Sequence, residues 1–180
     1  MADARAELTV FPVTADSAHP SALEREVVDH FDQMRDRLLR YLLGFGLSTQ
    51  DSEEIVQETF LALFRHLQRG RSRRNLRGWL FRVAHNLGLR KRQRTRVTEE
   101  IGDSMVDPTP NPEDQFATSQ TQQRLLAALN ALPEQDRRCL SLRAEGLRYR
   151  EIAEVLNMSL GGVALALGRS LARIARVAER

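Results

Sequence analysis

The stretch YREIAEVLNMSLGGVALALGR, residues 149–169, has the pattern of two helices joined by a tight turn. It predicts a short helix over residues 150–156, a turn at residues 157–159, and a longer helix after Ser159, whose hydroxyl suits an N-cap. Ala153 is small enough to let the helices cross closely. Apolar residues recur at the spacing that would fill the angle between them: Ile152, Leu156, Val163 and Leu167. The stretch therefore predicts a helix-turn-helix.

The sequence before this motif is also helical in pattern, because its apolar residues recur every three or four positions rather than every two. Glycines at 44, 46, 70 and 146, an asparagine N-cap at 75 and Pro133 mark the expected helix ends. We expect helices over about residues 22–43, 51–68, 75–92, 119–132 and 133–145.

Composition changes abruptly after Val97. Six carboxylates alternate with three prolines over residues 99–114, and no basic residue follows until Arg124. Such a stretch predicts an extended acidic linker. The fold class we expect is therefore all-α, with two small helical domains joined by that linker. The expected boundaries are a flexible tail at 1–20, a first domain at 21–96, the linker at 97–118 and the helix-turn-helix domain at 119–180.

Basic residues are concentrated in the first domain. Residues 59–98 contain twelve Arg or Lys and no Asp or Glu, although the whole chain has a net charge of only +3. Eleven of the twelve are arginine, whose planar fork pairs with phosphates and base edges. A merely solvated basic face usually contains interspersed acids, so this run favours nucleic acid as a partner.

Several other classes of protein are disfavoured. The four histidines lack metal-ligand spacing, and no glycine-rich phosphate loop or nucleophile motif is present. We therefore expect no enzyme activity, catalytic residue, metal or cofactor. No run of 18 apolar residues is present, so membrane insertion is not expected. The single cysteine, Cys139, has no partner for an internal disulfide and suits a buried position in a cytoplasmic protein.

Two motifs resemble conserved regions of one family. DSEEIVQETF at 51–60, followed by WLFRVAHN at 79–86, is similar to region two of the extracytoplasmic-function (ECF) sigma factors of the sigma-70 family. Leu132-Pro133-Glu134, Glu145-Gly146-Leu147 and the residues from Tyr149 to Ala153 are similar to region four. The resemblance spans about residues 22–176. It implies a bacterial transcription factor that binds core RNA polymerase, recognises a promoter and melts it.

The resemblance also implies roles for individual residues in the first domain. The helix expected over residues 51–68, which begins with acidic residues, would dock on the coiled coil of the largest polymerase subunit. The residues that would make this contact are Asp51, Glu53, Glu54, Gln57 and Phe60. Its carboxylates would equally complement a helix dipole. The arginine-rich loop, residues 69–75, and the helix that follows it would bind the unpaired minus-ten strand. The residues that would make these contacts are Arg69, Arg71, Arg73, Arg74, Asn75, Arg82, Asn86 and Arg90. Trp79 could stack on a base, but a core position is favoured.

The recognition helix departs from the family pattern. Polar and basic residues commonly found near its start are replaced by Gly162, Ala164, Leu165 and Ala166. Contacts to the minus-thirty-five duplex would then come from Arg148, Arg150, Ser159, Arg169 and Arg173, mainly to phosphates. The resemblance further implies binding to the polymerase flap and control by an anti-sigma factor. The alternative is a sigma-like interaction protein that binds an anti-sigma factor or polymerase without reading promoter DNA.

Overall fold

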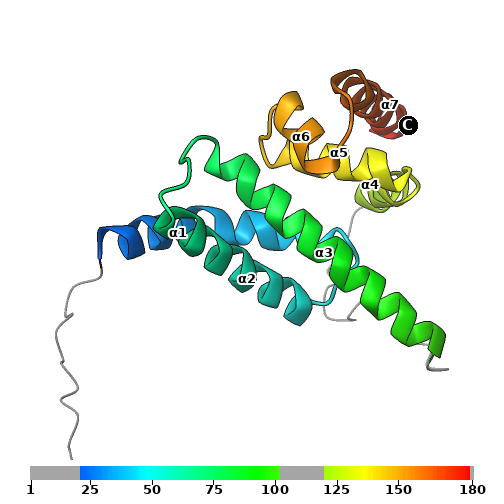
Figure 1. The fold of residues 1–180 in the computed structure, drawn as a ribbon. Coiled ribbons are helices and arrows are strands. Elements are labelled where there is room, and N and C mark those ends of the chain that lie inside the picture. Colours follow the sequence, from blue (N-terminus) through cyan, green and yellow to red (C-terminus); the bar gives the residue numbers. More distant parts are fainter. Residues whose placement is uncertain (1–20, 102–119, 179–180) are drawn as a thin grey trace, which may run out of the picture.

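The structure is a computed structural model that describes residues 21–101 and 120–178. Within these two ranges the chain forms seven α-helices and no strand (Figure 1). The all-α prediction is thereby confirmed for the described residues. The predicted tail at 1–20 lies outside them, as does the predicted linker beyond Ile101.

The first domain is a bundle of three helices. They are α1 (Ala22–Leu43), α2 (Thr49–Gln68) and α3 (Leu76–Ile101). The interior is filled by side chains that are fully buried, among them Leu38, Leu42, Leu63, Leu80 and Phe81. Helix α1 starts with a capping box in which the Ser21 hydroxyl accepts a hydrogen bond from the Glu24 amide, 3.2 Å away. This bundle is the frame on which the arginine-rich loop between α2 and α3 is mounted.

Two helix boundaries in the first domain differ from those expected. Helix α2 begins at Thr49 rather than near residue 51, because the Ser48 hydroxyl caps it by accepting from the Asp51 amide at 3.1 Å. Helix α3 does not stop near residue 92 and continues to Ile101. No glycine or proline interrupts the sequence between Leu89 and Ile101, so nothing in the backbone ends the helix earlier.

The second domain contains the predicted helix-turn-helix. Its helices are α4 (Gln120–Asn130), α5 (Glu134–Ala144), α6 (Tyr149–Leu156) and α7 (Leu160–Ala178). The axes of α6 and α7 are bent by 104° at the turn, within the usual range for this motif. Asn157 adopts a left-handed conformation with φ 51°, and the Ser159 hydroxyl accepts from the Gly162 amide at 3.0 Å. Both features stop α6 and start α7 within three residues.

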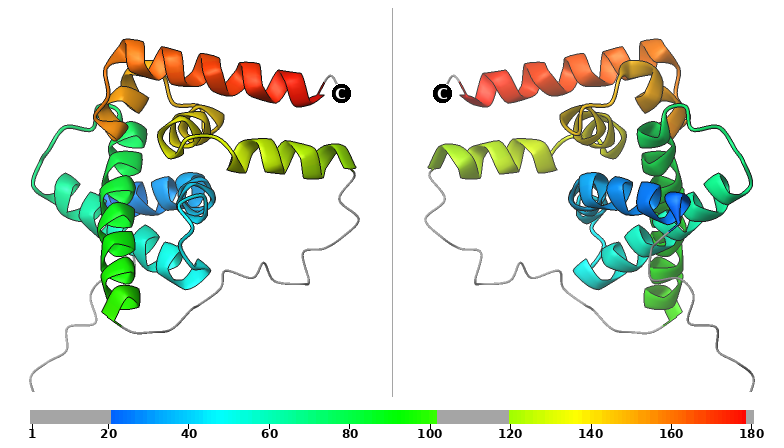
Figure 2. Two further views of the ribbon diagram at one scale, coloured as in Figure 1. Left: turned by 90° about the vertical axis from the view of Figure 1, so that its right-hand side faces the viewer. Right: turned by 90° about the vertical axis from the view of Figure 1, so that its left-hand side faces the viewer.

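The two domains pack against one another. Helices α5 and α6 lie over α1 and α3, as the views in Figures 1 and 2 agree. The cluster of buried apolar residues continues across the boundary from Phe45 and Phe81 to Leu142, Leu147 and Ile152. Among the described helices, none taken singly has the length and apolar character needed to cross a membrane; α6 and α7 pass that test only as a bent pair.

Candidate nucleic-acid interface

The arginine-rich loop, residues 69–75, projects between α2 and α3. Its basic side chains are exposed, and they belong to Arg69, Arg71, Arg73 and Arg74. Arg73 reaches back to α1 and donates through Nε and Nη2 to the Glu26 carboxylate, at 2.9 and 3.1 Å. Hydrogen bonding from Arg73 holds the pKa of Glu26 below its usual value. The other three arginines of the loop remain directed to solvent, where a polyanion can reach them.

Asn75 ends the loop and starts α3. Its side-chain oxygen accepts from the Gly78 amide at 3.2 Å, as expected for an N-cap, and its φ of 53° turns the chain into the helix. A Cβ added to Gly78 would lie 2.6 Å from the side-chain amide nitrogen of Asn75, so the glycine is needed for this cap. In this structure the Asn75 side chain has a local structural role at the base of the loop.

The outward face of α3 continues from the loop. Arg82, Asn86 and Arg90 are spaced four residues apart, are all exposed, and therefore form one row along the helix. Trp79, one turn earlier, is half-buried and packs at a tilt against His66 at the end of α2, with 4.6 Å between the ring centroids. The sequence favours a core position for Trp79; in the structure it is only partly buried and packs against the edge of the core cluster. The row and the loop together present exposed arginines and two side-chain amides, those of Asn75 and Asn86.

The acidic residues of α2 lie on a different face. Glu53, Glu54 and Gln57 are exposed, and Asp51 is half-buried. Lys91 of α3 approaches Asp51 at 2.7 Å and Glu54 at 3.3 Å, and hydrogen bonding from Lys91 lowers the pKa of Asp51.

Phe60, predicted with this group, is buried and packs edge-on against Phe31 of α1, with ring centroids 5.0 Å apart. It supports the acidic face from beneath rather than presenting a contact surface.

The helix-turn-helix exposes an apolar recognition helix. Leu165 is 63% exposed and Leu160 is 47% exposed on α7, beside Gly161 and Ala164. Arg148, Arg150 and Arg173 are exposed and form no salt bridge with any other residue that the structure describes. Arg169 instead clamps the buried carboxylate of Asp136 with two hydrogen bonds, at 2.9 and 3.1 Å. Arg169 thus joins α7 to α5, unlike the other three arginines that were predicted to contact the minus-thirty-five duplex.

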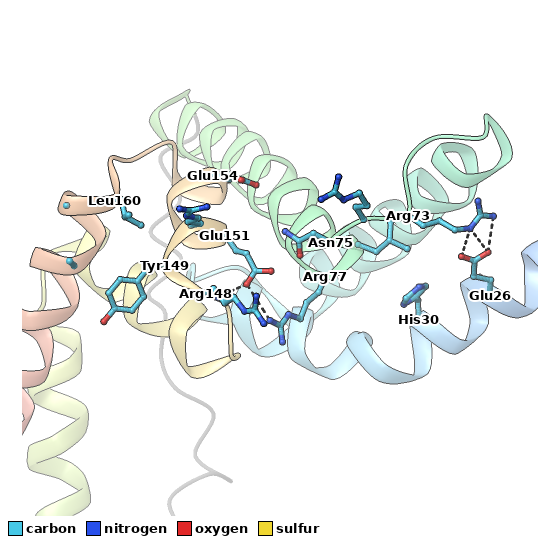
Figure 3. A pocket seen from close by; sticks show the side chains of 15 residues that line it. Glu26, His30, Arg73, Asn75, Arg77, Arg148, Tyr149, Glu151, Glu154 and Leu160 are labelled. Atoms are coloured by element: carbon cyan, nitrogen blue, oxygen red, sulfur yellow. Dashed lines mark hydrogen bonds and ion pairs between the residues drawn. The ribbon is translucent and has the colours of Figure 1, made fainter.

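A cleft of about 1330 Å³ lies between the domains (Figure 3). The arginine-rich loop and the start of α3 form one wall, and α6 with the start of α7 forms the other. Its basic side chains come from both domains and belong to Arg73, Arg74, Arg77, Arg148 and Arg150. The two surfaces expected to contact separate promoter elements therefore face one another across a single cavity.

Ion pairs hold this arrangement together. Glu145, whose side chain is only 10% exposed, accepts two hydrogen bonds from Arg40 of α1 at 3.1 and 3.2 Å and lies 3.4 Å from Arg37. Arg77 of α3 donates to the Gly146 carbonyl at 3.0 Å and approaches Glu151 at 3.4 Å. Arg92 pairs with Glu134, and Arg138 lies 4.7 Å above the ring of Phe45. None of these cross-domain pairs was predicted, since contacts over such sequence separations leave no local pattern.

Sequence reasoning also missed Glu26 and His66, the two side chains that reach the arginine-rich loop from neighbouring helices. Glu26 lies 47 residues before its partner Arg73. His66 follows a helical apolar pattern and looked like an ordinary surface or core residue. Only the packing of α1 and α2 beside the loop reveals their contacts.

Comparison with known proteins agrees with this architecture. The family description "Sigma-70 region 2" matches residues 30–97, and "Sigma-70, region 4" matches residues 122–174. The ECF RNA polymerase sigma factor SigE of Mycolicibacterium smegmatis is 35% identical over 162 residues, which cover 86% of this chain and 60% of that protein. The RNA polymerase sigma factor YlaC of Bacillus subtilis is 27% identical, over 80% of this chain and 87% of the relative.

Solved structures share the fold. A chain from the co-crystal structure of the sigma factor RpoE with the anti-sigma factor NepR from Bartonella quintana superposes with a TM-score of 0.66 at 18% identity, covering 86% of this chain and 98% of that one. These matches and the two-domain helical architecture define a sigma factor of the sigma-70 type. The chain belongs to the extracytoplasmic-function group of that family.

Proposed function

We propose that this protein binds core RNA polymerase in the bacterial cytoplasm and directs it to promoters, which the first domain recognises and melts. The single observation that carries the proposal is that the arginines of the loop and the row of Arg82, Asn86 and Arg90 on the following helix are all exposed. Melting requires unpaired bases to be held outside the duplex and cations to follow the freed strand. The chemistry of nucleotide addition belongs to the polymerase.

Within this proposal, each surface has a distinct task. The exposed Glu53, Glu54 and Gln57 of α2 bind the coiled coil of the largest polymerase subunit. The loop and Asn86 bind the minus-ten element as a single strand. The second domain binds the polymerase flap and holds upstream duplex through Arg148, Arg150 and Arg173, which contact phosphates rather than base edges.

An anti-sigma factor is the proposed regulator. The relatives with similar folds include RpoE, which was crystallised with the anti-sigma factor NepR, and CnrH, which was solved with the cytosolic domain of CnrY. Exposed apolar side chains on α7, including Leu160 and Leu165, provide the kind of surface that a protein partner covers.

The test is run-off transcription by a bacterial core polymerase on a library of promoter fragments, with and without the protein. We expect specific transcripts only when the protein is present. The alternative function, an interaction protein that does not read promoters, would give binding to core polymerase without any enrichment of sequences among the transcripts.

A further inference from the structure

One histidine, His66, forms a hydrogen bond to the middle of the arginine-rich loop. His66, in the last turn of α2, places its Nε2 atom 2.9 Å from the carbonyl oxygen of Ser72. Because a carbonyl oxygen can only accept, the ring must carry a proton on Nε2 and donate it. The same ring packs against Trp79 of α3 in a tilted orientation, with an angle of 43° between the planes. His66 therefore joins α2, the loop and α3 through one side chain.

Further contacts around His66 restrict the loop. The Arg71 amide donates to the His66 carbonyl at 3.2 Å, and the Ser72 hydroxyl accepts from the Arg74 amide at 3.2 Å. These bonds lie on either side of the His66–Ser72 bond. They fix the backbone of residues 71–74, from which the exposed arginines project. The remainder of the loop is exposed and has no apolar core to order it.

We propose that His66 is a positioning residue that holds the arginine-rich loop in the conformation that accepts the unpaired minus-ten strand, with Trp79 as the platform for its ring. The inference rests on the proposed function and adds a residue that does not itself touch DNA. A loop that samples other conformations binds with an affinity reduced by the fraction in the competent one. Losing one intramolecular hydrogen bond shifts such an equilibrium by about three- to tenfold.

Two substitutions separate the two contacts of His66. His66→Phe keeps a ring against Trp79 and removes the donor to Ser72. His66→Gln removes the ring but places an amide N–H near the position of Nε2, so it restores the donor. Gln68→Ala is the matched control, because Gln68 is exposed on the same final turn of α2 and its side chain is not part of the His66–Ser72 contact.

The probe is the single-stranded oligonucleotide that wild-type holoenzyme selects from a randomised pool. For the Phe variant we expect about three- to tenfold weaker binding of that oligonucleotide and reduced discrimination against single-base changes. The Gln variant should recover most of the loss, and Gln68→Ala should match the wild type. Affinity for core polymerase should stay unchanged in all three variants.

Trp79 reports the state of the platform, because it is the only tryptophan in the chain. Quenching of its fluorescence by acrylamide should rise in the Gln variant, which uncovers the indole, and stay unchanged in the Phe variant. A role limited to ending α2 would not produce this division between fluorescence and DNA binding.

The possible outcomes distinguish failure of the proposed function from failure of the positioning role of His66. A wild-type holoenzyme that selects no oligonucleotide would overturn the proposed function and the positioning role with it. A wild type that selects one, together with a Phe variant that binds and discriminates equally well, would overturn the positioning role alone. Equal losses in the Phe and Gln variants, accompanied by weaker core binding, would also contradict it by showing general damage to the fold.

Discussion

The first domain contains a buried histidine, His85. His85 lies inside the α1–α3 bundle with its Nδ1 atom 2.8 Å from the Tyr41 hydroxyl, and burial lowers the pKa of its imidazole from 6.5 to about 4. The positive charge of Arg138 from the second domain acts in the same direction. The folded protein therefore keeps this ring neutral at pH values where an unfolded chain would protonate it.

The sign of the pH dependence follows from that difference. Between pH 6.5 and pH 4 the unfolded state binds more protons, so stability is present at high pH and is lost as the pH falls. We predict a loss of about 2 kcal/mol between pH 7.5 and pH 5. Urea unfolding at several pH values measures it. His85→Asn, which retains a polar contact to Tyr41, should flatten the profile; an unchanged slope would assign the effect to other groups.

Two arginines on α7 should behave differently although both were predicted to contact DNA. Both side chains are exposed, but Arg169 pairs with the buried carboxylate of Asp136, whereas Arg173 forms no salt bridge with any described residue. Removing Arg169 leaves that carboxylate buried without its partner, which is unfavourable.

We therefore predict that Arg169→Ala lowers the melting temperature, while Arg173→Ala leaves it unchanged and reduces the salt dependence of duplex binding by about one phosphate contact. Thermal unfolding and binding isotherms at several salt concentrations check both. Equal melting temperatures for the two variants would show that the Asp136 pair is not structural.

At the scale of the element, the recognition helix α7 presents an unusual surface. Its exposed residues near the turn are Leu160, Gly161, Ala164 and Leu165. Apolar side chains can touch a thymine methyl group but cannot form the bidentate hydrogen bonds worth about 1–3 kcal/mol that distinguish base pairs.

We predict that scrambling the minus-thirty-five sequence reduces transcription less than scrambling the minus-ten sequence. Run-off transcription from the two scrambled templates measures this difference. A steeper loss from the upstream scramble, abolished by Leu165→Ala, would show that α7 reads bases.

The helices themselves were predictable from local chemistry, whereas their partners were not. The caps at Asn75 and Ser159 and the buried helix-turn-helix residues follow from side-chain types and spacing. The extension of α3 was missed because charged residues mark neither a continuing helix nor a linker clearly. The contacts of Glu26, His66 and Glu145 depend on how whole helices pack, and no spacing in the sequence encodes that packing.

At the scale of the whole molecule, the two domains occupy a closed arrangement. The minus-ten and minus-thirty-five elements of a promoter lie about 25 base pairs apart, or roughly 85 Å along B-DNA. Parts of both surfaces expected to contact them line one cleft of about 1330 Å³: Arg73, Arg74 and Asn75 from the first domain, and Arg148 and Arg150 from the second. Under the proposed function, the domains separate before both elements are bound, and the cross-domain pairs of Glu145 and Arg77 break.

We predict that Glu145→Ala shifts the free protein several-fold toward a separated form, because Arg40 and Arg37 lose the carboxylate that draws the domains together. Dyes on cysteines introduced at the exposed positions Gln33 and Ala172 would measure the separation. The native Cys139 is buried, and burial raises the pKa of its thiol to about 11, so it should not be labelled. Asp36→Ala, which removes a carboxylate of α1 that pairs within its own helix, is the control.

The central claim, that the first domain opens promoter DNA and holds the unpaired strand, is tested most directly by the permanganate reactivity of thymines in a promoter bound to the reconstituted holoenzyme. The account predicts reactive thymines in the minus-ten region only when both core polymerase and this protein are present. It also predicts that Arg74→Ala and Asn86→Ala reduce this reactivity while core binding persists. Thymines that stay unreactive with the wild-type protein would contradict the account. So would thymines that react as strongly with the two variants as with the wild type.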